Sequence, residues 1–303
     1  MERLPMDYAT VLHSISYSGS WGQVSLTVPE FVRKAADLGF DGVLLAAKRP
    51  HVSILDYGAK ERAALRSEIE KAGLGTVILA GYNNFTADLD HGDVPTLEIQ
   101  TAYVIELARL ARDIGAGLVR VFTGYEHPAG SYNAQWDMVV RALRECARRA
   151  SEWNVVIGVQ NHHDLACGYE SQRDLIRAVG EPNCLALFDA WAPALHGVDL
   201  QEAAQTMAPI TAHTTIANYV KRPRYRYRPE LVNYEPLTPV VRAAPIDEGF
   251  IDYGAFLEAL RDGGFRGSVA YEMCSPIEGG GSMENLDACA RRFIEFMRRF
   301  RGR

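Results

Sequence analysis

The sequence predicts a single (β/α)₈ TIM barrel domain that spans residues 1–303. Short runs rich in aliphatic and β-branched residues alternate with longer runs whose apolar residues have helical spacing, which is typical of a parallel α/β sheet. This alternation occurs eight times, and no low-complexity linker divides the chain. A barrel of this class needs about 250 residues, so one domain accounts for the whole length.

The elements follow from local signals along the chain. The first strand covers residues 8–15 and ends near His13, and a helix follows over 27–38, with Thr27 as its cap and Pro29 in its first turn. Further strands are expected over 41–47, 75–82, 117–124, 154–160, 184–189, 209–216 and 268–272. Further helices are expected over 58–72, 96–114, 134–152, 170–179, 253–262 and 283–300.

One connection is far longer than the others. Residues 217–250 separate the seventh strand from its helix, whereas loops in such units usually have about 2–6 residues. The segment interleaves Tyr225 and Tyr227 with the basic residues Lys221, Arg222, Arg224, Arg226 and Arg228. Two interpretations stay open: a lid, in which Arg222 and Arg224 bind substrate, or an arm that faces solvent or another subunit.

Composition excludes several classes of protein. The net charge of −6 does not favour nucleic-acid binding. No apolar run reaches about 18 residues and the first residues are too polar for a signal peptide, so we expect a cytoplasmic protein without a membrane partner. The five cysteines form no CxxC pair, which indicates free thiols rather than disulfides or a zinc site.

Polar residues at the strand ends form the candidate site. Side chains alternate in and out along barrel strands, and the carboxyl ends of the strands face the active site. Carboxylate, imidazole and amide ligands suit Mn²⁺ best, with Mg²⁺, Co²⁺ or Zn²⁺ as alternatives, and such an ion can stabilise an enediolate. The expected metal ligands are Gln160, Asp189, His213 and Glu272.

Each of these residues also has a plainer interpretation. Asp189 could cap a helix, His213 could be a core histidine, and Glu272 could pair with Arg120, which is also a candidate for substrate binding. Thr215 or His162 could complete the metal site in place of His213.

Five segments resemble the sugar-phosphate isomerase/epimerase group of xylose-isomerase-like TIM barrels. They are GFIDY, GGFRGSVAYE, GVQNHHD, ALFDAWAP and ITAHTTIANY. The resemblance implies a metal-dependent sugar enzyme. In epimerases of this group two glutamates bind the metal and act as bases, but here Gln160 replaces one of them. Thr215 stands at the usual histidine position, and Leu44 stands near a further glutamate position.

A histidine pair suggests what replaces the missing base. His162 and His163 could move protons at neutral pH, and Trp191 offers an apolar face to a sugar or aromatic ring. The segments NHHD, FDAWAP and YEMCSP resemble the larger subunit of bacterial C-glycoside deglycosidases. That resemblance implies cleavage of 3-oxo-glucosides of plant polyphenols together with a smaller β-rich subunit.

Three hypotheses therefore remain for the function. The first is a metal-dependent lyase of the deglycosidase type, with His162, His163 and Glu272 as catalytic residues and an oligomeric assembly. The second is a sugar or sugar-phosphate isomerase or epimerase, which needs a second base opposite Glu272. The third is a non-catalytic barrel subunit, motivated by Gln160 and Thr215. In the first two hypotheses the ligand is a small sugar or glycoside.

Overall fold

Eight parallel strands form a closed barrel in the computed structural model, which describes residues 8–302. Their order around the barrel is β1-β10-β7-β6-β5-β4-β3-β2, so the hydrogen bonds between β1 and β10 close the ring. The predicted fold class is confirmed. The barrel strands are β1 (Thr10–His13), β2 (Gly42–Ala46), β3 (Thr76–Ala80), β4 (Leu118–Val121), β5 (Val156–Gln160), β6 (Cys184–Leu187), β7 (Thr211–Ile216) and β10 (Ser268–Tyr271).

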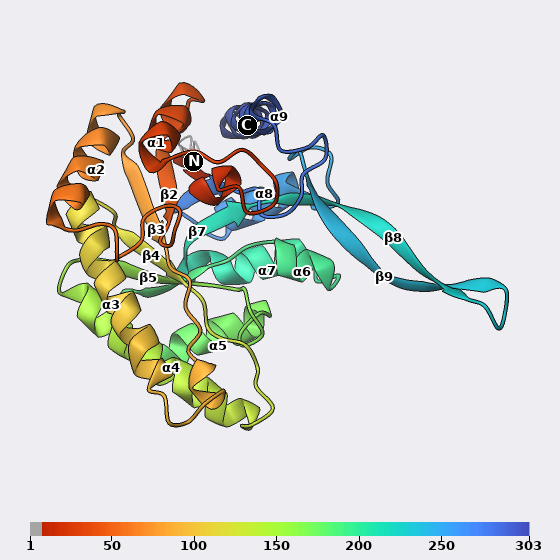
Figure 1. Ribbon diagram of the computed structural model, residues 1–303, viewed down its shortest axis with the longest axis horizontal. Helices are drawn as coiled ribbons and strands as arrows, with labels where there is room; N and C mark the ends of the chain where they lie inside the picture. Colours follow the sequence, from red (N-terminus) through yellow and green to blue (C-terminus); the bar gives the residue numbers. More distant parts are fainter. Residues whose placement is uncertain (1–7, 303) are drawn as a thin grey trace.

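The helices surround this barrel (Figure 1). The α-helices are α1 (Val28–Asp37), α2 (Ala59–Lys71), α3 (Thr96–Ile114), α4 (Tyr132–Ser151), α5 (Tyr169–Val179), α6 (Trp191–Leu195), α7 (Leu200–Met207), α8 (Tyr253–Asp262) and α9 (Met283–Arg301). Three short 3₁₀ helices cover Ser14–Tyr17, Ala87–Leu89 and Ala208–Ile210.

Two of these helices were missed by the sequence analysis. Helices α6 and α7 lie between β6 and β7, and Asp199 caps α7 by accepting hydrogen bonds from the backbone N–H groups of Gln201 and Glu202 at 2.9 and 3.1 Å. The segment DLQEAAQTM therefore carried a recognisable cap followed by a short apolar stripe.

The barrel interior is filled by apolar side chains, and it blocks any passage through the barrel. Val11, Leu44, Ile78, Leu118 and Leu187 pack there as one cluster. Gly158 makes room for Leu187, because a Cβ atom at residue 158 would lie 2.0 Å from Leu187 Cδ1. The polar residues above this layer can therefore be reached only from one end of the barrel.

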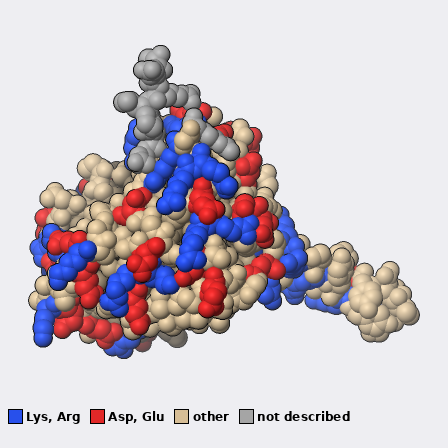
Figure 2. All heavy atoms as spheres, turned by 90° about the horizontal axis from the view of Figure 1, so that it is seen from above, with Lys and Arg blue, Asp and Glu red and all other residues tan. Residues whose placement is uncertain are grey.

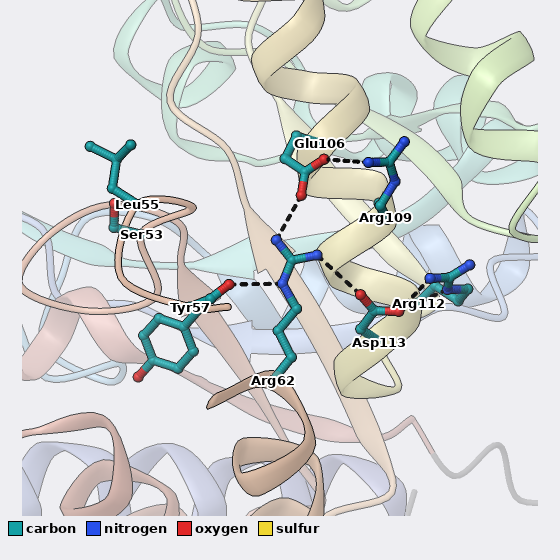
Figure 3. Close-up of polar contacts among 8 residues, drawn as sticks. All are labelled: Ser53, Leu55, Tyr57, Arg62, Glu106, Arg109, Arg112 and Asp113. Atoms are coloured by element: carbon teal, nitrogen blue, oxygen red, sulfur yellow. Dashed lines mark hydrogen bonds and ion pairs between the residues drawn. The ribbon is translucent and has the colours of Figure 1, made fainter. Parts of the chain in front are cut away.

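A charged network joins α2 to α3 on the outside of the barrel (Figure 3). The Arg62 guanidinium lies 2.6 Å from Glu106 and 3.0 Å from Asp113, and its Nε donates to the Tyr57 carbonyl at 2.9 Å. The Arg62 side chain is only 11% exposed, so its partners replace most of its hydration.

We expect Arg62→Met to lower the free energy of unfolding by about 1–3 kcal/mol, because it leaves Glu106 and Asp113 without their shared cation. Urea unfolding followed by circular dichroism measures this change. Arg66→Met is the matched control, since Arg66 forms an exposed pair with Glu70 on the same helix, and it should change stability by less than about 0.5 kcal/mol. Equal effects of the two substitutions would contradict the role assigned to Arg62.

The long connection after β7 is a two-stranded arm rather than a loop. Strands β8 (Asn218–Arg228) and β9 (Asn233–Ala244) pair antiparallel and extend away from the barrel (Figure 1). Basic residues alternate with Tyr225 and Tyr227 in β8, and this period of two is that of a strand, which explains why the segment forms a β-hairpin. Figure 2 shows basic residues toward the base of the arm and mostly uncharged residues at its tip.

Only the base of the arm belongs to the barrel. Tyr219 and Ala243 are buried, whereas Tyr225, Leu231 and Val232 are 63%, 69% and 80% exposed. The outer part of the arm projects away from its own barrel and therefore does not cover it as a lid. Within residues 8–302, no helix combines the length and apolar character that a membrane span requires.

Candidate active site at the barrel mouth

A cavity of about 390 Å³ opens at the carboxyl ends of the barrel strands. Its polar wall is formed by residues of β4 and β5 and by residues one or two positions after the ends of β2, β3, β5, β6 and β10. These residues are Lys48, Tyr82, Arg120, Gln160, His162, Asp189 and Glu272. The position, the size and the convergent polar groups are those of a small-molecule site.

Two carboxylates lie on one side of this cavity. Asp189 accepts a hydrogen bond from the Thr215 backbone N–H at 2.6 Å and another from the side-chain amide of Gln160. Glu272 has a weaker contact, with its Oε1 3.8 Å from His13 Nε2. Burial raises the pKa of Asp189 to about 6 and the pKa of Glu272 to about 7. Glu272 is therefore suited to accept a proton near neutral pH.

His213 lies below the cavity rather than on its wall. It is fully buried, its Nδ1 lies 2.7 Å from Ser268 Oγ, and its Nε2 has no hydrogen-bond partner within the described part of the chain. Thr215, two residues farther along β7, reaches the cavity instead. Burial lowers the pKa of His213 to about 3, so the ring is neutral.

The oxygen-bearing side chains fit a hard divalent cation. Among residues 8–302, no three His, Cys, Asp or Glu side chains come close enough together to form a metal site. A site at the two carboxylates therefore depends on the Gln160 carbonyl oxygen, which stays available because the amide N–H of Gln160 contacts Asp189. Mg²⁺ and Mn²⁺ accept carboxylate and amide oxygens, which matches this donor set.

The two histidines after β5 have different surroundings. His162 Nδ1 accepts the backbone N–H of His163 at 2.9 Å, which leaves the proton of the neutral ring on Nε2. The His163 ring lies 4.1 Å from the Tyr125 ring and 4.2 Å from the Phe122 ring. Burial is the main cause that lowers the pKa of His162 to about 4 and that of His163 to about 3. Both rings are neutral at pH 7, and in this tautomer His162 donates from Nε2.

An aromatic wall faces the histidines. The Trp191 ring centroid lies 5.5 Å from that of Tyr219 and 5.8 Å from that of His162. The Tyr219 hydroxyl contacts Cys274 Sγ at 2.8 Å, and both side chains line the cavity. Aromatic faces of this kind pack well against the apolar face of a sugar ring.

Two cations lie on the other side of the cavity. Arg120 on β4 is 4% exposed, and its guanidinium carbon lies 4.0 Å from the Phe122 ring centroid. Lys48 Nζ lies 3.9 Å from the Tyr82 ring centroid. By contrast, Arg222 and Arg224 do not line the cavity, and Arg222 pairs with Glu278 at 2.9 Å. The structure therefore does not bring the two arm arginines to the site.

The sequence analysis missed several residues of the wall. Lys48, Tyr82 and Cys274 line the cavity and continue the inward alternation of a strand. Lys48 and Tyr82 lie two residues past the ends of β2 and β3, and extending the period-two pattern beyond the last β-forming residue could have found them.

The partly buried Glu272 carboxyl, with its side chain 17% exposed, predicts a stability difference that depends on pH. Its folded pKa of about 7 lies above the ordinary value of 4.5, so the folded protein binds this proton more tightly than the unfolded chain does. Stability should fall as pH rises from about 4.5 to about 7. Glu272→Gln removes this effect, so in EDTA at pH 8 the variant should be more stable than the wild type by about 2–3 kcal/mol.

Urea unfolding at pH 5 and pH 8 measures this difference. Glu278→Gln is the control, because Glu278 forms only an ion pair with the exposed Arg222 and should show no such gain at pH 8. A Glu272→Gln variant less stable than the wild type at pH 8 would contradict the burial of an unpaired carboxylate.

A parallel barrel with a polar cavity at its mouth defines a TIM-barrel protein of the enzyme type. Residues 32–299 match the family described as xylose isomerase-like TIM barrel, and the chain belongs to that family. The expected family is confirmed.

Named relatives share only part of the sequence. A 2-epi-5-epi-valiolone 7-phosphate 2-epimerase of Actinoplanes sp. is 25% identical over 178 residues, which span 59% of this chain and 63% of that protein. The chain thus matches less than two thirds of the length of this relative.

Solved structures share the fold at low sequence identity. A D-psicose 3-epimerase with D-tagatose from Clostridium cellulolyticum is 16% identical with a TM-score of 0.72, and the alignment covers 96% of this chain and 99% of that one. A xylose isomerase-like TIM barrel protein from Mycobacterium smegmatis in complex with magnesium is 14% identical with a TM-score of 0.69, and the alignment covers 99% of both chains.

Proposed function

We propose that the protein is a sugar isomerase or epimerase that abstracts a proton from the carbon next to a sugar carbonyl. The observation that carries this proposal is the partly buried Glu272 carboxyl on the cavity wall, whose pKa of about 7 suits proton transfer at neutral pH. The names of the Actinoplanes relative and of the psicose epimerase support the choice of a sugar substrate. This ranks the isomerase or epimerase hypothesis above the deglycosidase hypothesis.

Each residue of the cavity has its own role in the proposed reaction. Glu272 accepts the proton from carbon, and His162 donates from Nε2 to a substrate oxygen on the other side of the cavity. Trp191 and Tyr219 hold an apolar face of the sugar, and Asp189 and Gln160 hold polar groups between these walls. The roles of His163 and His213 are to position neighbouring groups, because His163 lies against two aromatic rings and His213 lies under the cavity.

Asp189, Glu272 and Gln160 are also the residues that would hold a divalent ion, Mn²⁺ or Mg²⁺ by the chemistry of their oxygens. When bound, such an ion polarises the carbonyl and stabilises the charge that develops on its oxygen. His213 Nε2 is buried and has no hydrogen-bond partner among residues 8–302, but His213 does not come close enough to Asp189 and Glu272 to complete a three-ligand site with them.

Solvent exchange tests the proposed reaction. In D₂O, incubation with keto sugars such as D-psicose, D-tagatose and L-ribulose should place deuterium on the carbon next to the carbonyl, as measured by NMR. Glu272→Gln should slow this exchange at least about a hundredfold, because an amide cannot accept the proton. Glu278→Gln should leave it unchanged. Exchange at the wild-type rate in Glu272→Gln would contradict the role of Glu272 as base.

Thermal unfolding tests the ion site without any assay of activity. Added Mn²⁺ should raise the melting temperature of protein stripped with EDTA, because an ion that binds only the folded state stabilises it. Asp189→Asn should abolish this rise, whereas Asp88→Asn in the 3₁₀ helix Ala87–Leu89, away from the cavity, should retain it. An equal rise in wild type and Asp189→Asn would exclude Asp189 as a ligand.

Elimination of a leaving group is the second candidate reaction. Its supporting observation is Gln160, which cannot serve as the second base of a two-base epimerisation, together with the Nε2–H of His162, which can protonate a leaving group. In this case the protein would act on 3-oxo-glucosides as a C-glycoside deglycosidase subunit with a smaller β-rich partner. Release of the aglycone, with no deuterium in the recovered substrate, would favour elimination. If the protein neither releases an aglycone nor exchanges deuterium, and binds no metal, a non-catalytic subunit would be favoured.

A further inference from the structure

The charges of the cavity are separated in space. The carboxylates Asp189 and Glu272 follow β6 and β10, whereas the cations Lys48 and Arg120 lie at β2 and β4. In the closed order of strands, β5 stands between β4 and β6, and β1 stands between β2 and β10. The cations and the carboxylates therefore occupy different sectors of the same mouth.

Arg120 is a buried cation without an ion-pair partner among residues 8–302. It is 4% exposed, and its guanidinium carbon lies 4.0 and 4.7 Å from the ring centroids of Phe122 and Tyr82. No Asp or Glu of residues 8–302 forms an ion pair with Arg120 or Lys48. A buried charge without a paired counter-charge is costly, so its retention at a cavity wall indicates a ligand that supplies the opposite charge.

Lys48 adds a second positive charge beside the first. Its Nζ lies over the same Tyr82 ring that Arg120 contacts. Burial first, and then the charge of Arg120, lower the pKa of Lys48, which means that an anion placed between the two groups would relieve their repulsion. A planar guanidinium fork next to a mobile ammonium suits a phosphate dianion.

We propose that Arg120 and Lys48 form a subsite for a phosphate group, so that the substrate is a phosphorylated sugar whose phosphate binds between β2 and β4 while its reacting carbon faces Glu272. This inference rests on the proposed function and adds the substrate class to it. The cavity of about 390 Å³ has room for one sugar monophosphate but not for a nucleic acid or a lipid.

Binding measurements on the full-length protein test the subsite apart from catalysis. Isothermal titration with inorganic phosphate should give saturable binding to the wild type, and glucose 6-phosphate should compete while glucose does not. Glucuronate has the same ring with a carboxylate in place of the phosphate ester, and it should compete more weakly, because it carries one negative charge instead of two.

Substitutions assign the binding to the two cations. Lys48→Met should weaken the affinity for phosphate about tenfold or more, Lys48→Arg should restore most of it, and Arg120→Met should weaken it further. Lys48 is exposed, so its variant tests the proposal even if Arg120→Met fails to fold. Arg224→Met is the matched control on the arm and should bind phosphate as the wild type does.

Three results would overturn the proposal: no phosphate binding, tighter binding of glucuronate than of glucose 6-phosphate, or equal losses in Lys48→Met and Arg224→Met. The proposed function is tested separately, because it predicts deuterium exchange that depends on Glu272. If the wild type binds no phosphate, and if Lys48→Met and the wild type exchange deuterium into neutral keto sugars at the same rate, the phosphate subsite is excluded. The proposed proton-transfer reaction would still stand.

Discussion

Closure of the barrel is the constraint on which the rest of the structure depends. Strand β10 pairs with β1 on one side and with β7 on the other, so the last strand completes the ring that the first begins. A closed parallel ring places every strand's carboxyl end at the same mouth. Because apolar side chains fill the interior below, polar residues at those ends have only one cavity in which to meet.

That geometry explains the raised pKa values of the two carboxylates at the mouth. Glu272 and Asp189 lose water by standing above the packed interior, and burial raises the pKa of each. Hydrogen bonds from Thr215 and Gln160 hold Asp189 in place. Within residues 8–302 the Glu272 carboxylate comes no closer to a basic group than 3.8 Å, at His13 Nε2, and the charge of Arg120 partly offsets the effect of burial on its pKa. The less satisfied carboxylate is the better proton acceptor, and this difference separates the roles of two chemically similar groups.

Much of the fold could be predicted from the sequence, because apolar residues alternate with a period of two in strands and of 3.6 in helices. A segment of only a few residues is enough to tell the two periods apart. Asp189 and Glu272 could be found for the same reason, since each directly follows an apolar strand. The depth of His213 below Thr215 could be predicted as well, because residues two positions apart on a strand lie on the same face, one layer apart.

The arm and the cationic wall illustrate two limits of such prediction. Basic and aromatic residues around Arg224 were compatible with a lid, and only the pairing of β8 with β9 shows that they project away from the barrel. Lys48 and Tyr82 lie two residues beyond their strands, where the extended period-two pattern gives their direction but not their contacts. Their approach to Arg120 depends on barrel closure, which brings together residues separated by more than thirty positions.

The central claim is that Glu272 is a partly buried carboxyl that exchanges a proton near neutral pH. Carbon-detected NMR of protein labelled with ¹³C at glutamate carboxyls, with the signal assigned by its loss in Glu272→Gln, measures this directly. The account predicts that in metal-free protein the Glu272 carboxyl titrates with a pKa of about 7. A Glu272 carboxyl that titrates near the ordinary value of 4.5 would contradict it.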